Sequence, residues 1–151
     1  MKVLHINCNY IGTALHQKMI EHLDAIGVQS KVFAPTYDSN LAVIKVNDNV
    51  AVKECFKKWD RVLFDYKQKK IIKCLEGTYD IKQFDCIHAY TLFTDGNSAN
   101  KLFEKYGIPY VVAIRNTDVN TFMKYMMHLR SRGVRIMRDA RAIFFLSEEY
   151  R

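Results

Sequence analysis

Short apolar runs alternate along the chain with longer segments in which apolar residues recur every three or four positions. The short runs are typical of buried strands, and the longer segments are typical of amphipathic helices. The predicted strands are residues 2–7, 31–34, 86–89, 110–114 and 142–146, and residues 42–46 fit a further short strand. The predicted helices are residues 14–26, 54–75, 98–106, 119–131 and 134–139. This alternation predicts an α/β fold with a doubly wound, mostly parallel sheet.

Residues with known cap and turn preferences mark the predicted ends of these elements. Thr13 is the predicted N-cap of the first helix, and Asn97 is the predicted N-cap of the helix that begins at residue 98. Gly107 is a predicted helix stop, and Pro35 is the predicted end of the second strand. The predicted inward-facing stripe of the helix at 54–75 consists of Phe56, Trp59, Val62, Leu63, Tyr66 and Ile72.

Composition places the chain among globular proteins. Its 151 residues are 49% hydrophobic and 26% charged, with six glycines and two prolines, which excludes disorder and low-complexity linkers. The length suits one domain, residues 1–151. The longest apolar runs have five residues, whereas a membrane-spanning helix needs about 20. Residues 1–7 do not resemble a secretory signal, and the four cysteines lack CxxC spacing, so we expect a cytoplasmic protein with reduced thiols.

Two segments carry most of the positive charge, and the formal net charge of the chain is +7. Residues 53–73 have eight Lys and Arg against three acidic residues, and residues 124–141 have six against one. Such segments suit nucleic acid, an anionic membrane surface or phosphorylated substrates, and they equally suit solvated helix faces. We expect peripheral association with the inner face of a membrane, because each basic residue near an anionic surface contributes about 1 kcal/mol.

The sequence lacks the motifs of the common cofactor and metal sites. Its glycines match neither GxGxxG nor GxxxxGK, which argues against NAD, FAD and P-loop chemistry. Its five histidines form no HxH or HExxH pattern, so no metal site is predicted. Ligands of doubly wound sheets bind beyond the carboxyl ends of the strands, so the candidate residues are those that follow the predicted strands.

Two of these strand ends offer single candidate positions. Gly12 and Thr13 begin the first helix, where free backbone N–H groups can hold a phosphate, and a simple turn with a cap explains them equally well. His88 ends a strand and suits hydrogen bonding to a substrate hydroxyl or acid–base chemistry. A partly buried structural histidine is the alternative for His88.

The densest polar cluster follows the strand at 110–114. Arg115 suits a phosphate or carboxylate because its planar guanidinium binds two oxygens. Asp118 suits sugar hydroxyls, proton transfer or pairing with Arg115. Asn116, Thr117 and Asp118 also suit the cap of the next helix, which is compatible with ligand contact.

Several segments, taken in order, resemble a known family. They read DCIH at 85–88 with Asp-Gly at 95–96, YGIPYVVAIRNTD at 106–118 and ARAIFFLS at 140–147, after an opening strand at 1–7. Their order and spacing are similar to the N-terminal domain of GT-B glycosyltransferases, above all the retaining family 4, also called glycosyl transferases group 1. The chain departs from that family in having only Gly12 in the first loop and Arg115 where many members have a histidine.

This resemblance implies a Rossmann-like half of a GT-B fold, the acceptor-side fragment of a longer enzyme of polysaccharide biosynthesis. The full enzyme would transfer a sugar from a nucleotide-sugar donor to a glycan or lipid-linked acceptor, with retention, and this chain alone would be inactive. A C-terminal domain would bind most of the donor, and neither a cofactor nor a metal is expected. The implied catalytic residues are Asp118, Arg115 and His88. The implied donor-phosphate contacts are Gly12 and Thr13, and the implied acceptor contacts are Asn116, Thr117 and Asp95.

Two other classes of function are compatible with the same pattern. The first is a non-catalytic α/β binding module that holds nucleic acid or another polyanion through its basic segments. Those segments lack a recognised reading motif, so we expect no nucleic acid among the partners. The second is a nucleotide-binding signalling domain of flavodoxin-like topology, which would carry paired acidic residues after the first strand, where this chain has Asn7-Cys8-Asn9.

Overall fold

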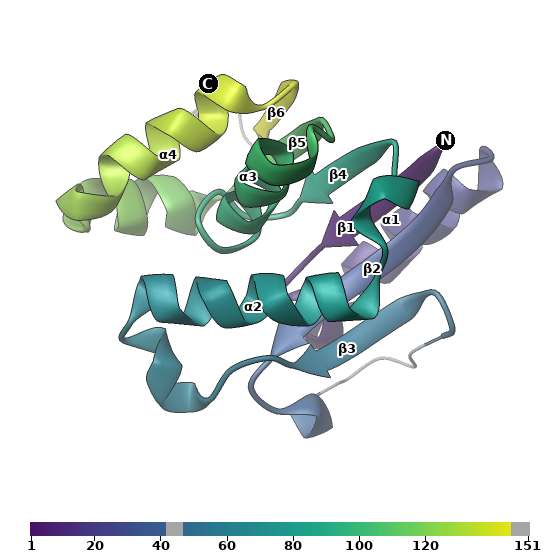
Figure 1. Ribbon diagram of the computed structural model, residues 1–151, viewed down its shortest axis with the longest axis horizontal. Helices are drawn as coiled ribbons and strands as arrows, with labels where there is room; N and C mark the ends of the chain where they lie inside the picture. The colour runs from purple at the N-terminus through teal and green to yellow at the C-terminus, as the bar shows by residue number, and fades with distance from the viewer. Residues whose placement is uncertain (42–46, 146–151) are drawn as a thin grey trace.

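Six parallel strands form one sheet in the order β3-β2-β1-β4-β5-β6 (Figure 1). The computed structural model describes residues 1–41 and 47–145. The strands are β1 (Lys2–Ile6), β2 (Gln29–Thr36), β3 (Val50–Glu54), β4 (Cys86–Ala89), β5 (Tyr110–Ile114) and β6 (Ala142–Phe145). β1 pairs with both β2 and β4, so the strand order reverses between β1 and β4. The predicted doubly wound parallel sheet is confirmed.

Helices cover both faces of this sheet. They are α1 (Ala14–Ala25), α2 (Phe64–Thr78), α3 (Thr94–Tyr106) and α4 (Met127–Asp139). Figure 1 shows α1 behind the sheet and α2, α3 and α4 in front of it. Right-handed crossovers explain the two layers, because the chain moves across the sheet in one direction from β1 to β2 and in the other from β3 to β6. No helix of the described ranges combines the length and the apolar content needed to cross a bilayer.

The main core lies between the sheet and the three helices in front of it. Leu4, Ile87 and Val112 from the strands pack there with Leu75 of α2 and Ile136 of α4, all of them fully buried. A smaller core lies beneath α1, where Ile20 packs with Val32 and Tyr10. The two cores hold the strands rigidly, so the positions of the residues that follow the strands are well defined.

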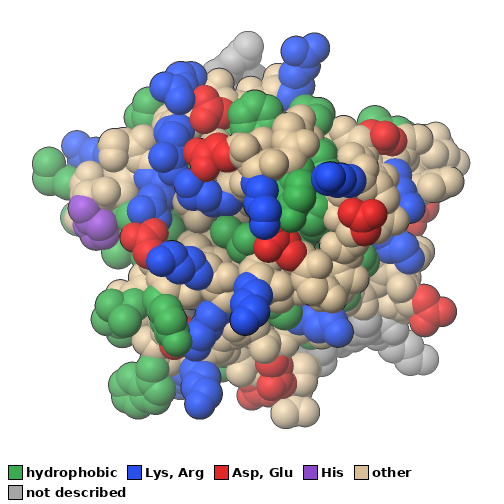
Figure 2. Space-filling model, viewed as in Figure 1, with side chains coloured by type: hydrophobic (Ala, Val, Ile, Leu, Met, Phe, Trp, Pro, Cys, Tyr) green, Lys and Arg blue, Asp and Glu red, His purple; other side chains and the backbone are tan. Residues whose placement is uncertain are grey.

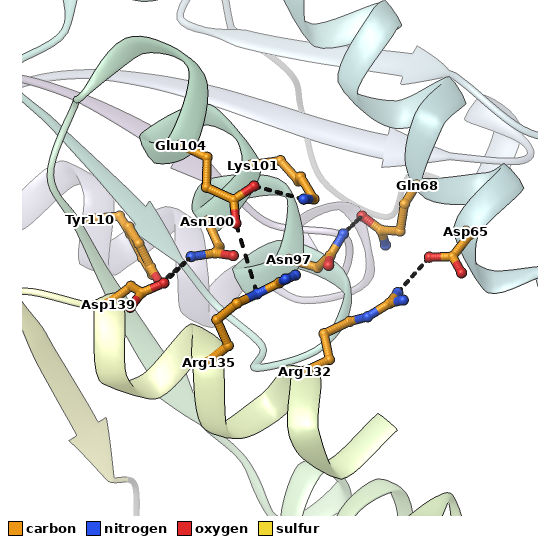
Figure 3. Close-up of polar contacts among 10 residues, drawn as sticks. All are labelled: Asp65, Gln68, Asn97, Asn100, Lys101, Glu104, Tyr110, Arg132, Arg135 and Asp139. Carbon is orange, nitrogen blue, oxygen red and sulfur yellow. Dashed lines mark hydrogen bonds and ion pairs between the residues drawn. The ribbon is translucent and has the colours of Figure 1, made fainter. Parts of the chain in front are cut away.

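Polar side chains join α2, α3 and α4 within the front layer (Figure 3). The buried first half of α3 contributes Asn97 and Asn100, which donate to Gln68 Oε1 of α2 and to Asp139 Oδ2 of α4, both at 3.2 Å. Arg132 Nη1 of α4 lies 2.6 Å from Asp65 Oδ1 of α2. These contacts explain why a helix with many polar residues is buried, and they fix the spacing of the three helices.

The predicted bounds of the second strand, 31–34, are corrected to Gln29–Thr36. β2 continues through Pro35 to Thr36. The proline is tolerated because β1 has already ended at Ile6, so no β1 carbonyl needs a hydrogen bond from an N–H at position 35. The backbone of Thr36 still accepts from the N–H of Cys55, so β2 remains paired with β3. The strand predicted at 42–46 lies outside the described residues, and the strand that pairs with β2 is Val50–Glu54.

The long helix predicted at 54–75 is wrong in its first half. β3 ends at Glu54, a 3₁₀ turn spans Lys58–Arg61, and α2 begins only at Phe64 and ends at Thr78. Asp60 stabilises this break, because its carboxylate accepts from the N–H of Lys57 at 2.7 Å and pairs with Lys70 at 2.6 Å. The inward stripe predicted for this segment is confirmed only in part: Phe56 and Ile72 pack against the main core, whereas Trp59, Val62, Leu63 and Tyr66 are exposed.

The later helices differ from the prediction at their starts. α3 begins at Thr94, so Asn97 lies inside the helix and does not cap it, whereas Gly107 ends α3 as predicted, in the left-handed region with φ 73°. The helices predicted at 119–131 and 134–139 are a π-helical turn, Asp118–Met123, and one continuous α4. Gly133 lies inside α4 because its missing Cβ leaves room for the ring of Phe93.

Candidate functional site

The carboxyl ends of β1, β4 and β5 meet at the point where the strand order reverses. β1 is followed by a loop and α1, β4 by Tyr90 and α3, and β5 by Arg115 and the π-helical turn. Contacts join all three segments: the N–H of Cys8 donates to Asp95, and Arg115 donates to the carbonyl of Tyr90. The predicted strand-end segments 8–13, 88–95 and 115–118 therefore lie together.

A cluster of aromatic and basic side chains lies on the α1 side of this edge; we call it the histidine cluster, and it consists of His5, His16, His88, Tyr90 and Arg115. His5 and His88 are direct neighbours across β1 and β4, with ring centroids 5.4 Å apart. The ring of Tyr90 stacks on His88 at 4.3 Å, and its hydroxyl shares a hydrogen bond of 3.1 Å with Nδ1 of His5. The alternation of side chains along a strand explains why His88 and Tyr90 face the same way.

Arg115 closes the histidine cluster from the β5 side. Its Nε donates to the carbonyl of Tyr90 at 2.7 Å, and its Nη2 donates to Nε2 of His16 at 3.0 Å. His16 belongs to the first turn of α1 and also meets the ring of Tyr90 edge-on, with centroids 5.1 Å apart. Nη1 of Arg115 has no hydrogen-bond partner within residues 1–41 and 47–145. The guanidinium of the half-buried Arg115 is thus held in place by two hydrogen bonds.

Burial keeps the three histidines of this cluster neutral. Desolvation, with the neighbouring His88 as the second cause, lowers the pKa of His5 to about 3. Desolvation also lowers the pKa of His16 to about 4, with Arg115 as the second cause, and the pKa of His88 to about 4, with His16 as the second cause. At neutral pH the cluster therefore offers neutral imidazoles beside one fixed positive charge, the guanidinium of Arg115.

Asp118 does not face the histidine cluster; it supports the loop after β5. Its side chain is buried, and its Oδ2 accepts from the backbone N–H groups of Leu92 and Arg115, both at 3.0 Å. Desolvation raises the pKa of Asp118, and these backbone hydrogen bonds oppose the shift. The carboxylate joins the segment after β4 to the segment after β5, so it positions Arg115.

Asp95 lies in the first turn of α3 and is fully buried beneath the loop after β1. Its Oδ1 accepts from the N–H of Cys8 at 3.2 Å, and its own N–H donates to the hydroxyl of Thr91. Desolvation raises the pKa of Asp95 to about 7, while the N–H of Cys8 opposes the shift. Its Oδ2 has no hydrogen-bond partner among the described residues. Asp95 thus ties the β1 loop to α3 rather than facing solvent.

The remaining predicted residues lie at the rim of this edge. Thr13 caps α1 by accepting from the N–H of Leu15 at 3.3 Å, as predicted, and Gly12 is exposed with open space around its α-carbon. Asn116 and Thr117 are exposed after β5, and Asn116 accepts from the side chain of Asn120 at 2.7 Å. These four residues leave backbone and side-chain groups accessible beside the histidine cluster.

Sequence reasoning did not single out His5, His16 or Tyr90. The signal for His5 was its period-two spacing to Asn7, which puts two polar residues on one face of an otherwise apolar strand. The signal for His16 was its position three residues after the cap Thr13, which puts it in the first turn of α1. Tyr90 directly follows the strand that contains His88.

The arrangement suits hydrogen bonding and anion contact more than metal or acid–base chemistry. The described residues contain no group of three or more His, Cys, Asp or Glu that could hold a metal ion. Imidazoles with a pKa of about 4 are weak bases at neutral pH, but they donate and accept hydrogen bonds. No protein-family model and no curated protein sequence matches the chain.

Proposed function

We propose that this chain forms the acceptor-side domain of a glycosyltransferase that moves a sugar from a nucleotide-sugar donor to a glycan or lipid-linked acceptor. The observation that carries the proposal is the histidine cluster at the carboxyl ends of the central strands. Sugar hydroxyls both donate and accept hydrogen bonds, and neutral imidazoles and a phenol do the same. One guanidinium among them suits a phosphate of the donor or of a lipid-linked acceptor.

The position of this cluster supports the same proposal. In doubly wound sheets, ligands bind outside the carboxyl ends of the strands at the point where the strand order reverses. Here that point lies between β1 and β4. The segments that carry the resemblance to GT-B glycosyltransferases, 85–88 and 106–118, contain most of β4 and all of β5, and both lead to this same edge.

The proposal gives a role to each residue that the sequence singled out. His88 hydrogen-bonds an acceptor hydroxyl as a neutral imidazole, and Arg115 contacts a phosphate through Nη1. Asp118 is a positioning residue, because its carboxylate accepts from the N–H of Arg115 and is itself buried. The exposed Asn116 and Thr117 contact the acceptor, and the backbone at Gly12 and Thr13 lies near the donor phosphates. Asp95 supports the loop after β1.

Saturation-transfer NMR on the isolated chain tests the proposal. The ligands are oligosaccharides, sugar 1-phosphates and nucleotide-sugars. We expect saturation of sugar protons by at least one of them, and loss of that signal in His88→Ala and in the double variant Asn116→Ala/Thr117→Ala. The matched controls are His128→Ala and Arg138→Gln, which change exposed residues of α4.

Three results would overturn the proposal. No saturation by any sugar ligand would remove it. Equal loss of signal in the α4 controls would show that the ligands bind without using the histidine cluster. Saturation confined to the nucleotide base, unchanged by the His88 variant, would favour a nucleotide-binding module over an acceptor-side domain.

A further inference from the structure

An apolar stripe with helical spacing lies in solvent at the start of α2. Trp59 is 85% exposed, Val62 83% and Leu63 64%, and Tyr66 follows in the first turn of the helix at 51%. Trp59 lies in the 3₁₀ turn, Val62 and Leu63 connect this turn to α2, and Tyr66 lies in α2, so the four side chains are close together in the chain. Exposing this many large apolar side chains side by side is unfavourable in water, and contiguous patches of this kind mark interaction surfaces.

The backbone holds these side chains outward. The N–H of Val62 donates to the carbonyl of Trp59, and the N–H of Leu63 donates to the carbonyl of Asp60, so two consecutive turns lead into α2. Asp60 anchors the turn through the N–H of Lys57 and the ammonium of Lys70. Because these contacts fix the conformation of the turn, the outward position of the apolar side chains is part of the folded structure.

Two further apolar side chains lie at the start of α4. Tyr125 and Met127 are 71% and 69% exposed. Arg132 of α4 connects this region to the start of α2, because its Nη1 pairs with Asp65 and its guanidinium lies 4.9 Å from the ring centre of Phe64. Figure 2 shows apolar side chains protruding at the left edge of this face, the end where α2 and α4 begin in Figure 1. We call Trp59, Val62, Leu63, Tyr125 and Met127 the apolar wedge.

Positive charge accompanies the apolar wedge. Lys57, Lys58 and Lys69 are exposed in the same segment, and Lys124 lies 5.4 Å from the ring centre of Tyr125. The acidic residues of the segment at the start of α2, Asp60 and Asp65, are held in ion pairs with Lys70 and Arg132. Lys and Arg side chains lie among the protruding apolar groups in Figure 2. The surface therefore presents exposed apolar side chains surrounded by lysines.

We propose that the apolar wedge docks this protein onto the surface of an anionic lipid bilayer. Trp and Tyr favour the membrane–water interface, aliphatic tips enter the boundary between headgroups and acyl chains, and lysines beside them meet anionic headgroups. A nucleic-acid backbone would match the lysines but would leave Val62 and Leu63 in water. The inference rests on exposed residues alone and does not depend on sugar transfer. If both proposals hold, a lipid-linked acceptor reaches the same carboxyl edge of the sheet.

Trp59 is the only tryptophan of the chain, so its fluorescence reports on the apolar wedge directly. The probes are vesicles of phosphatidylcholine alone and vesicles that contain phosphatidylglycerol as well. With anionic vesicles we expect a blue shift of the emission and quenching by lipids with brominated acyl chains. Binding to neutral vesicles is expected to be about 100-fold weaker, because the contribution of several lysines is lost.

Matched variants separate the apolar and the charged contributions. Val62→Ser/Leu63→Ser keeps the tryptophan and is expected to weaken partitioning about 30-fold. Its control, Leu15→Ser/Ile26→Ser, removes two equally exposed aliphatic side chains at the ends of α1 and is expected to change nothing. Lys57→Glu/Lys58→Glu is expected to weaken binding to anionic vesicles about 30-fold, and its control Lys18→Glu/Lys82→Glu less than threefold.

Four outcomes would overturn the docking proposal. The first is an unchanged Trp59 emission with anionic vesicles, and the second is equal binding to neutral vesicles. The third is the same blue shift with RNA or heparin, which would indicate a polyanion in place of a bilayer. The fourth is a lipid-free dimer in sedimentation velocity that Val62→Ser/Leu63→Ser abolishes, since the wedge would then be an interface between two copies.

Discussion

Single residues set the charge at the carboxyl edge of the sheet. The protonation state of each side chain there depends more on its burial than on its residue type. Sequence reasoning found Arg115, His88 and Asp118 because each lies at or just after the end of a strand, and the structure brings their segments together. It could not foresee that Asp118 points inward to two N–H groups, because the direction of a side chain after a strand depends on the loop. Likewise, the neutral state of His16 and His88 follows from tertiary burial, which no local pattern contains.

The buried histidines make stability depend on pH. The folded chain holds His5, His16 and His88 with pKa values of about 3 to 4, whereas the unfolded chain binds protons near pH 6.5. Stability is therefore lost as the pH falls from about 6.5 to about 4. Asp95 opposes this trend, because its pKa of about 7 makes the folded chain bind a proton that the unfolded chain releases above about pH 4. Burial raises the pKa of Asp118 as well, so Asp118 opposes the trend in the same way. Three histidines against two carboxyl groups predict a net loss of stability on acidification.

Urea unfolding at pH 7, 5.5 and 4.5 measures this loss. The free energy of unfolding is expected to fall with each step, and more steeply in Asp95→Asn, in which the opposing proton is absent. His5→Phe is expected to flatten the dependence, whereas replacement of the exposed His128 by Gln serves as its control. A free energy of unfolding that rises on acidification would contradict the burial of neutral histidines.

Asp118 provides a second prediction at this scale. Asp118→Ala leaves the N–H groups of Leu92 and Arg115 without their shared acceptor, and we expect a loss of about 1–3 kcal/mol in the free energy of unfolding. Asp48→Ala, at an exposed position, is the control and is expected to stay within about 0.5 kcal/mol. Equal effects of the two substitutions would show that Asp118 does not support the loop.

Elements were predicted well where local and tertiary preferences agree. The strands at 86–89 and 110–114 are confirmed to the residue, because both are short apolar runs buried on both faces. The segment 54–75 misled the prediction, since the stripe that includes Trp59 and Val62 has helical spacing without being buried. Helical spacing of apolar residues predicts a helix with an apolar face, but only the fold decides whether the segment is one helix and whether those side chains meet the core or the solvent.

The end of α3 tests the part of the element prediction that succeeded. Gly107 has φ 73°, which costs a residue with a Cβ about 1–2 kcal/mol, so Gly107→Ala is expected to destabilise the chain by about that amount. Gly77 lies inside α2 with no atom near its absent Cβ, so Gly77→Ala is expected to stabilise by up to about 1 kcal/mol. Thermal unfolding should show opposite shifts, and shifts of the same sign would refute this account of α3.

At the scale of the whole molecule, the histidine cluster and the apolar wedge lie at one edge. The loops after β1, β4 and β5 form the histidine cluster, while the starts of α2 and α4 carry the wedge. In a parallel α/β sheet the strands end and the helices begin at the same edge, so both features follow from the topology. A ligand presented at a bilayer surface would therefore reach the strand ends from the side that the wedge faces.

The proposed function also predicts what the chain fails to do alone. Positioning two substrates against each other supplies about 7–11 kcal/mol of a transfer barrier, and by the resemblance most donor contacts belong to another domain. We expect no sugar transfer by these 151 residues and only weak affinity for nucleotide-sugars in isothermal titration. Micromolar donor affinity together with turnover that Arg115→Gln abolishes would show a complete active site in this chain.

Chemical-shift mapping by two-dimensional ¹⁵N NMR tests the central claim, that the carboxyl ends of β1, β4 and β5 bind a sugar ligand. The ligand is the sugar compound that gives the strongest saturation transfer. We expect the largest shift changes on backbone amides at 8–16, 88–95 and 115–118, with little change in Gln29–Thr36 or in α4 beyond residue 133. The largest changes on the start of α2, or at the amino ends of the strands, would contradict it.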